Sequence, residues 1–301
     1  MKPFADRLAA LVEERRSQVC LGLDPDPASL PDDGGGDPSP DATVAAAAAV
    51  ASHCRSLIAA AGPACVAVKP QLACFERLGA PGREALGEVC KAAREAGLLV
   101  VADGKRGDVP TTAMAYAQSL IGETPTPWGP VPGLGADAVT ANPLMGGDAV
   151  EPLIEQAARA GAGVFCLVRT SNPGAADFED LDAGGRPLHE HLAAFVAARS
   201  GRLAGESGLS GMGAVVGATE PHHLGRMREL MPEAVFLVPG VGAQGGRPED
   251  LGPALAPGRR ASILVAAARS IAGAPDPGAA AEELRSALWD GLEAGMLPPP
   301  S

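Results

Sequence analysis

Residues 98–112 read LLVVADGKRGDVPTT, and this stretch indicates both the fold and the place of the functional site. An apolar run at 98–102 ends in Asp103, Lys105 and Asp108, which are three charges within six residues. Such a run is typical of a parallel strand that is buried on both faces. On an extended chain, Asp103 and Lys105 are two residues apart and project to the same side. Because clustered charges are costly to desolvate without partners, we expect a functional site where this strand ends.

The same alternation of apolar runs and helical segments continues along the 301 residues. Predicted strands lie at 19–23, 65–68, 98–102, 136–140, 163–168, 213–217, 235–238 and 262–267. Predicted helices lie at 44–60, 83–96, 111–121, 149–160, 188–204, 221–230 and 279–292, and the segment after Val238 is the weakest helix prediction. This pattern predicts an α/β fold, a (β/α)8 TIM barrel that forms one domain over residues 1–301. A doubly wound open sheet is the alternative, since the number of strands does not show whether the sheet closes.

Two segments rich in proline and glycine interrupt this alternation. They lie near 31–40 (PDDGGGDPSP) and near 122–135 (GETPTPWGPVPGLG). Their content of proline and glycine disfavours regular structure, so we expect both to be surface loop insertions that take no part in the chemistry.

The composition excludes several classes of function. The formal net charge is −12 and only 3% of the residues are aromatic, so we expect no nucleic-acid partner. The N-terminal residues lack the apolar core of a signal peptide, and no later run approaches transmembrane length, so we expect a cytoplasmic protein without a membrane partner. The six cysteines form no C-x-x-C pair and are expected to be reduced packing residues. No metal site is predicted.

Polar side chains follow almost every predicted strand. The carboxyl ends of the strands build the active site of a barrel, so we expect these side chains to meet in one site. Individually, some have simpler explanations: Asp24 precedes Pro25 in a turn, and Asp108 is placed to cap a helix beginning near Thr111. The candidates along the rim are Asp24, Lys69, Asp103, Lys105, Arg169, Ser171, Gln244 and Arg269.

Residues 240–245 (GVGAQG) match the G-x-G-x-x-G pattern of dinucleotide-binding folds. That fingerprint belongs to the first βαβ unit and is followed about 20 residues later by an acidic residue. Here it follows the seventh predicted strand, and Arg259 and Arg260 occupy the later position. We therefore interpret the loop as the phosphate site of a barrel, in which the glycines let backbone N–H groups approach phosphate oxygens and Arg269 supplies a charged fork.

The residues DGKRGD at 103–108 match the D-x-K-x-x-D signature of orotidine 5′-monophosphate decarboxylase. The resemblance covers nearly the whole chain apart from the two insertions and both termini. Asp24, Lys69, Ser171 and the loop at 239–244 resemble residues of that family. One departure is Ala268, where a glycine often precedes the phosphate-binding arginine.

This resemblance implies a cofactor-free homodimer with shared active sites. It implies conversion of orotidine 5′-monophosphate to uridine 5′-monophosphate (UMP) and CO2, the last step of pyrimidine biosynthesis. Lys105 would stabilise and then protonate the C6 carbanion. Catalytic roles are implied for Lys69, Asp103 and Lys105 of one subunit and Asp108 of its partner, and substrate-binding roles for Asp24, Thr112, Ser171, Pro239, Gln244 and Arg269.

Three other functions stay open at this point. A Mg2+-dependent decarboxylase of 3-keto-sugar phosphates shares the D-x-K-x-x-D frame, but its strand-two position is typically acidic where this chain has Lys69. A class I aldolase needs a lysine with a lowered pKa, whereas flanking aspartates favour the charged form of Lys105. A nucleotide sensor without catalytic activity is the third.

Overall fold

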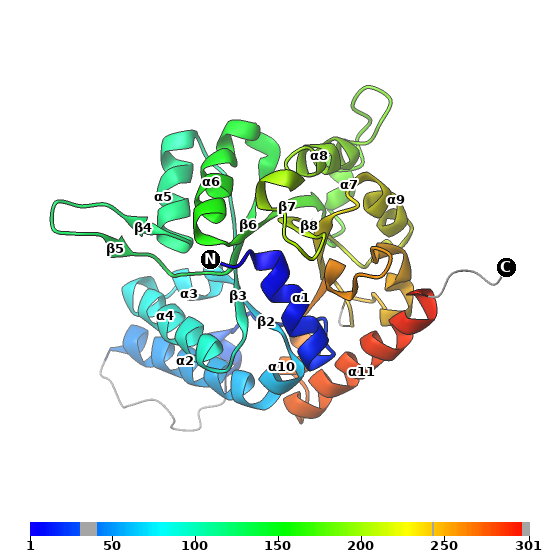
Figure 1. The fold of residues 1–301 in the computed structure, drawn as a ribbon. Helices are drawn as coiled ribbons and strands as arrows, with labels where there is room; N and C mark the ends of the chain where they lie inside the picture. Colours follow the sequence, from blue (N-terminus) through cyan, green and yellow to red (C-terminus); the bar gives the residue numbers. More distant parts are fainter. Residues whose placement is uncertain (31–40, 243, 297–301) are drawn as a thin grey trace.

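Eight parallel strands close into a barrel in the order β1-β10-β9-β8-β7-β6-β3-β2 (Figure 1). The computed structural model describes residues 1–30, 41–242 and 244–296. Closure confirms the predicted TIM barrel and excludes the open sheet. The barrel strands are β1 (Val19–Leu23), β2 (Ala67–Pro70), β3 (Leu99–Arg106), β6 (Ala138–Ala141), β7 (Gly163–Arg169), β8 (Ser210–Val216), β9 (Ala234–Pro239) and β10 (Ile263–Ala267).

Helices surround the barrel, and all seven predicted helices are found with shifted ends. The α-helices are α1 (Phe4–Arg15), α2 (Ala42–Ala61), α3 (Leu72–Glu76), α4 (Gly79–Glu95), α5 (Pro110–Leu120), α6 (Glu151–Ala160), α7 (Ala175–Phe178), α8 (Leu188–Ala197), α9 (His222–Leu230), α10 (Arg269–Ala272) and α11 (Pro277–Met296). The 3-10 helices are η1 (Pro27–Ser29), η2 (Gly62–Ala64), η3 (Pro143–Met145), η4 (Gly147–Ala149), η5 (Ser200–Leu203), η6 (Pro248–Ala254) and η7 (Arg260–Ser262). The weak helix after β9 is thus the 3-10 helix η6, and α8 ends earlier than predicted.

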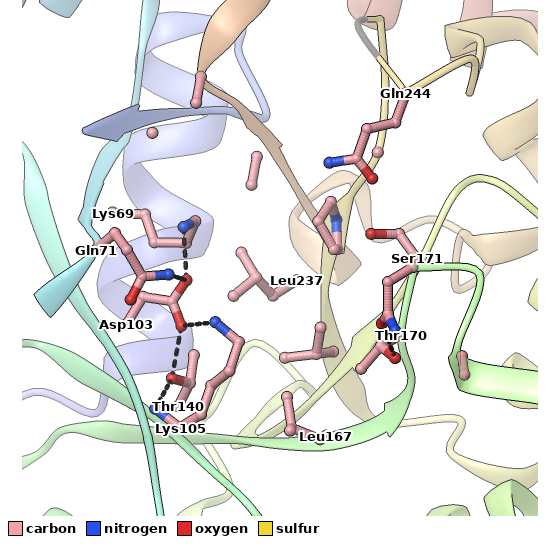
Figure 2. A pocket seen from close by; sticks show the side chains of 18 of the residues that line it. Lys69, Gln71, Asp103, Lys105, Thr140, Leu167, Thr170, Ser171, Leu237 and Gln244 are labelled. Carbon is pink, nitrogen blue, oxygen red and sulfur yellow. Dashed lines mark hydrogen bonds and ion pairs between the residues drawn. The ribbon is translucent and has the colours of Figure 1, made fainter. Parts of the chain in front are cut away.

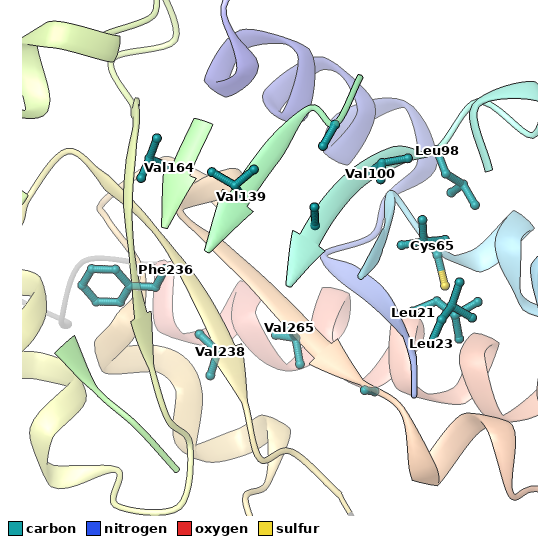
Figure 3. Close-up of a cluster of buried hydrophobic side chains, with 14 of the residues drawn as sticks. Leu21, Leu23, Cys65, Leu98, Val100, Val139, Val164, Phe236, Val238 and Val265 are labelled. Carbon is teal, nitrogen blue, oxygen red and sulfur yellow. The ribbon is translucent and has the colours of Figure 1, made fainter. Parts of the chain in front are cut away.

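The apolar core has two parts, because alternate strand residues face opposite sides of the barrel wall. One part fills the space between the strands and the outer helices, with Val100, Val139 and Val265 among its members (Figure 3). The other fills the barrel interior and its amino end, where Phe4 of α1 packs edge-to-face on Phe165 with ring centroids 5.8 Å apart. Each such buried side chain contributes about 1.5–3 kcal/mol, so the site rests on a rigid scaffold.

The strand β3 is longer than predicted and contains the beginning of the charged motif. It runs to Arg106, and its register against β6 shifts between Ala102 and Arg106. Lys105 lies in this irregular part with a φ of 48°, a left-handed conformation that is rare outside glycine. The motif is therefore held on a bulged strand rather than on the loop after a regular one.

The segment at 122–135 contains regular structure, contrary to the prediction. Its two ends pair as a short antiparallel ribbon of β4 (Glu123–Thr124) and β5 (Val131–Pro132), which extends away from the barrel in Figure 1. Proline and glycine content did not reveal this pairing because it needs only two residues on each side. The other predicted insertion, 31–40, lies outside the described residues.

The helix α2 also corrects a prediction. Together with η2 it forms an apolar stretch, Ala42–Ala64, that is long enough to cross a membrane by length and composition. It packs against α4 and α11 and buries Val50, Cys54, Leu57 and Ile58 in the barrel's outer core. The apolar composition of α2 is thus explained by its packing among the helices that surround the barrel. The cysteines are free, as predicted, and all except Cys74 are buried.

Candidate active site

A cavity of about 490 Å³ opens at the carboxyl ends of the barrel strands. Its volume is in the range of small-molecule sites. Every residue predicted for the site lines this cavity except Asp108, Thr112 and Arg169, and Arg169 instead pairs with Asp180 behind the cavity wall. The predicted residues that the barrel brings together are Asp24, Lys69, Asp103, Lys105, Ser171, Pro239, Gln244 and Arg269.

The centre of the site is the carboxylate of Asp103, held between two ammonium groups. Lys69 Nζ lies 2.6 Å from Oδ2 and Lys105 Nζ lies 2.7 Å from Oδ1. Gln71 Nε2 donates a further hydrogen bond to Oδ2 at 3.2 Å (Figure 2). Lys69 Nζ also lies 3.8 Å from the carboxylate of Asp24. The side chains of Asp103 and Lys69 are 6% and 10% exposed, but that of Lys105 is 43% exposed. Of the two lysines on Asp103, Lys105 is therefore the one that a ligand can reach more easily.

These contacts fix the charges of the site. Burial alone would raise the pKa of Asp103, but the charges of Lys69 and Lys105 and their hydrogen bonds lower it to about 2. Burial alone would lower the pKa of Lys69, but the carboxylates of Asp103 and Asp24 outweigh it and raise that pKa. Asp103 and Lys69 are thus charged at neutral pH. The ammonium group of Lys69 disfavours a divalent cation at this place.

The backbone of Lys105 is held by Thr140, a residue of β6 that is 1% exposed. Its hydroxyl accepts a hydrogen bond from Lys105 N at 2.8 Å and donates one to Asp103 Oδ1 at 2.9 Å. One hydroxyl thus connects the left-handed backbone of Lys105 to the carboxylate that its side chain contacts. The expected meeting of Asp103 and Lys105 is confirmed, but it depends on this bulge and not on a regular extended strand.

The opposite side of the cavity is formed by the segment after β7 and the loop after β9. Ser171 and Gln244 lie there, across from the lysines, and Leu167 and Leu237 lie between the two sides (Figure 2). Among the described residues, the hydroxyl of Ser171 has no hydrogen-bond partner. The cavity therefore offers an apolar wall with a charged end and a polar, unsatisfied end.

The glycine loop after β9 uses three of its amides for hydrogen bonds within the loop. Gly240, Gly242 and Gly245 have φ values of 99°, 80° and 96°, which explains their identity. However, Gly242 N donates to Gly246 O, Gly245 N to Gly242 O, and Gly246 N to Gly240 O. These glycines therefore shape a closed turn and do not present those amides to an anion. The exposed side chains of the neighbouring Gln244 and Arg269 are the groups available for one.

Asp108 and Thr112 lie near the rim but outside the cavity of their own chain. Asp108 accepts a hydrogen bond from Val109 N at 2.8 Å, and α5 begins at Pro110 with no side-chain cap. The alternative role of Asp108 as a helix cap is therefore wrong. Neither residue is fully buried, so both are accessible to a second molecule.

Sequence reasoning missed four polar residues of the cavity, Gln71, Thr140, Asn142 and Glu179. Gln71 and Asn142 follow β2 and β6 directly, so a search of every strand end would have found them. Thr140 lies inside an apolar strand, where threonine is common, and its role depends on the bulge in β3. Within the described residues, no group of three or more histidine, cysteine or acidic side chains is arranged to hold a metal ion.

The fold and the site define a (β/α)8-barrel enzyme with a Lys–Asp–Lys array at the carboxyl ends of its strands. Residues 17–284 match the model of the orotidine 5′-phosphate decarboxylase / HUMPS family. The chain belongs to this family.

Individual relatives agree with this assignment. An orotidine 5′-phosphate decarboxylase of Rhodopirellula baltica is 40% identical over 258 residues, which are 85% of this chain and 83% of the relative. One of Deinococcus radiodurans is 39% identical over 300 residues, which are 97% and 98% of the two chains. The solved structure of the Leishmania donovani OMP decarboxylase superposes with a TM-score of 0.73 at 34% identity and covers 98% of this chain and 99% of that one.

Proposed function

We propose that this protein decarboxylates orotidine 5′-monophosphate to UMP and CO2, the last step in the synthesis of UMP. The observation that carries the proposal is the pair of contacts at 2.6 and 2.7 Å that holds the Asp103 carboxylate between Lys69 and Lys105. The relatives are named orotidine 5′-phosphate decarboxylases, and we infer the substrate from that name. The array of Lys69, Asp103 and Lys105 offers a physical reason for catalysis of this reaction.

Loss of CO2 from C6 of the pyrimidine leaves a carbanion with no adjacent carbonyl or imine to take up the charge. An ammonium group already in place stabilises that charge as it develops and then donates a proton to C6. We assign both roles to Lys105, because it is the more exposed of the two lysines on Asp103. The fixed carboxylate of Asp103 holds the ammonium group of Lys105 at the cavity wall.

The other residues are assigned to parts of the nucleotide. Asp24 and Lys69, whose Oδ1 and Nζ atoms lie 3.8 Å apart, would hold ribose hydroxyls. Ser171, with its unpaired hydroxyl, and Pro239 would contact the pyrimidine, while Gln244 and Arg269 would hold the phosphate. Phosphate contacts far from C6 supply binding energy that the enzyme uses at the reacting centre.

We further propose a homodimer in which Asp108 and Thr112 complete the site of the partner subunit. The support is that both residues carry suitable side chains close to the rim but lie outside their own cavity. A dimer would place a second carboxylate near each Lys105 and would hold that lysine in its charged form. We also propose that the enzyme is cofactor-free and cytoplasmic, a location in which its six free cysteines stay reduced.

The test is to follow the absorbance of orotidine 5′-monophosphate with the purified protein, with and without a metal chelator. We expect turnover that the chelator does not change and no release of CO2 from 3-keto-sugar phosphates. Absence of turnover would refute the proposal. Turnover of a keto-sugar phosphate that the chelator abolishes would instead support the metal-dependent alternative.

A further inference from the structure

The segment 170–187 follows β7, and its first residues form part of the cavity wall. The chain then comes back to the end of β7 at Glu179 and Asp180. The outer part of this segment is held by few apolar contacts, because Ala175 is its one buried residue. A wall segment with so little buried surface needs other contacts to keep its shape. The structure supplies them as a group of polar contacts at its base.

The first contact is a bidentate ion pair. Arg169, the last residue of β7, is 6% exposed and donates from Nε to Asp180 Oδ1 at 2.8 Å and from Nη2 to Oδ2 at 3.0 Å. Its Nη1 also donates to Thr170 O at 2.8 Å. Paired guanidinium–carboxylate hydrogen bonds are directional and strong, so the ion pair fixes the middle of the segment to the end of β7.

The second contact is made by the carboxylate of Glu179, which lies on the cavity wall. Glu179 Oε2 accepts a hydrogen bond from Thr170 N at 2.7 Å, and Oε1 accepts one from the Thr170 hydroxyl at 3.0 Å. Glu179 O in turn accepts from His189 N at 2.8 Å, which connects it to the buried first turn of α8. Glu179 thus ties the backbone before Ser171 to a rigid helix.

Ser171 itself is packed closely on the neighbouring strand ends. A Cβ atom on Gly217 would lie 2.7 Å from Ser171 Cα, and Ser171 O accepts a hydrogen bond from Thr219 Oγ1 at 3.1 Å. Ser171 is therefore held directly by packing and, through the preceding residue Thr170, by Glu179. The direction of its free hydroxyl depends on both.

We infer that Glu179, supported by the Arg169–Asp180 ion pair, is a positioning residue that fixes Ser171 for recognition of the pyrimidine. The inference rests on the proposed function, because it assigns Ser171 to the base of the nucleotide. The positioning role assigns different parts of the site to different parts of the nucleotide. Residues 170–179 contact the base, and Asp24, Lys69 and Arg269 hold the ribose phosphate.

The experiment compares binding of UMP and of ribose 5-phosphate, which lacks the base, to the wild-type protein and to three variants. Glu179→Ala removes both hydrogen bonds to Thr170, while Glu179→Gln keeps an acceptor for Thr170 N and a polar partner for its hydroxyl. The matched control is Asp177→Ala, which removes an exposed carboxylate two residues away that does not line the cavity.

For Glu179→Ala we expect the Kd of UMP and the KM of orotidine 5′-monophosphate to rise roughly ten- to hundredfold, as expected for lost hydrogen bonds to a charged group. The Kd of ribose 5-phosphate should stay within about twofold, which also shows that the variant is folded. Glu179→Gln and Asp177→Ala should bind UMP within about threefold of the wild type.

Equal losses for UMP and ribose 5-phosphate, or no loss for UMP, would overturn the positioning role. If the Glu179→Ala protein does not fold, the measurement is made on Asp180→Asn, which weakens the ion pair with Arg169. The results expected for Asp180→Asn, and those that would overturn the positioning role, are the same as for Glu179→Ala. Failure of the wild type to turn over orotidine 5′-monophosphate would instead refute the proposed function itself.

Discussion

Replacing Thr140 with valine should disable the site while leaving its volume and charges unchanged. Valine has the shape of threonine but lacks the hydroxyl that bonds Lys105 N and Asp103 Oδ1 at 2.8 and 2.9 Å. A hydrogen bond to a charged group contributes about 1.5–3 kcal/mol, and a buried amide without an acceptor costs about 1–3 kcal/mol. The left-handed backbone of Lys105, with a φ of 48°, would lose a contact that opposes its strain.

We therefore expect Thr140→Val to lower kcat about 10²-fold, since about 1.4 kcal/mol corresponds to a factor of ten in rate. The free energy of unfolding in urea should fall by about 2 kcal/mol or more. Thr140→Ser, which keeps the hydroxyl, is the control and should lose less than about tenfold in kcat. A Thr140→Val protein with kcat within about twofold of the wild type would refute the role given to this hydroxyl.

Three further predictions concern the two ends of the substrate and the central carboxylate. Arg269→Ala should lower kcat/KM by an amount that corresponds to several kcal/mol of transition-state stabilisation. A loss below about 0.5 kcal/mol would contradict the assignment of Arg269 to the phosphate site. Lys105→Ala and Asp108→Asn proteins, each inactive alone, should regain activity when mixed if Asp108 serves the partner's site, whereas persistent inactivity of the mixed dimers would contradict the shared site. The pKa of Asp103, lowered from 3.8 to about 2, should add about 2 kcal/mol to the free energy of unfolding above pH ~4. This contribution is lost as the pH falls through about 2, and urea titrations of Asp103→Asn should lack that part of the pH dependence.

Much of the fold could be predicted because parallel strands in a barrel are apolar on both faces. The eight apolar runs correspond to the eight strands, and the polar residues after them lie around one cavity. No single segment of the sequence predicts that the sheet closes, because closure depends on the pairing of β1 with both β2 and β10. The fold class therefore followed from the repeated pattern, and closure only from the structure.

The parts that could not be predicted depend on contacts between segments far apart in the sequence. The bulge in β3 is supported by a hydroxyl on β6, and the use of the glycine amides is decided within a folded turn. Glu179 lies in a polar stretch that resembles any exposed loop, and only the return of the chain to Arg169 gives it a role. Local composition also hid the ribbon of β4 and β5.

The most direct test of the central claim is the rate at which the Lys105→Ala protein converts saturating orotidine 5′-monophosphate to UMP in a single turnover. Lys105 is proposed both to stabilise the carbanion and to protonate it, and each role typically contributes a factor of roughly 10² or more. We predict a rate at least about 10⁴-fold below that of the wild type, with UMP binding retained. A rate within about tenfold of the wild type would contradict the assignment of the chemistry to Lys105.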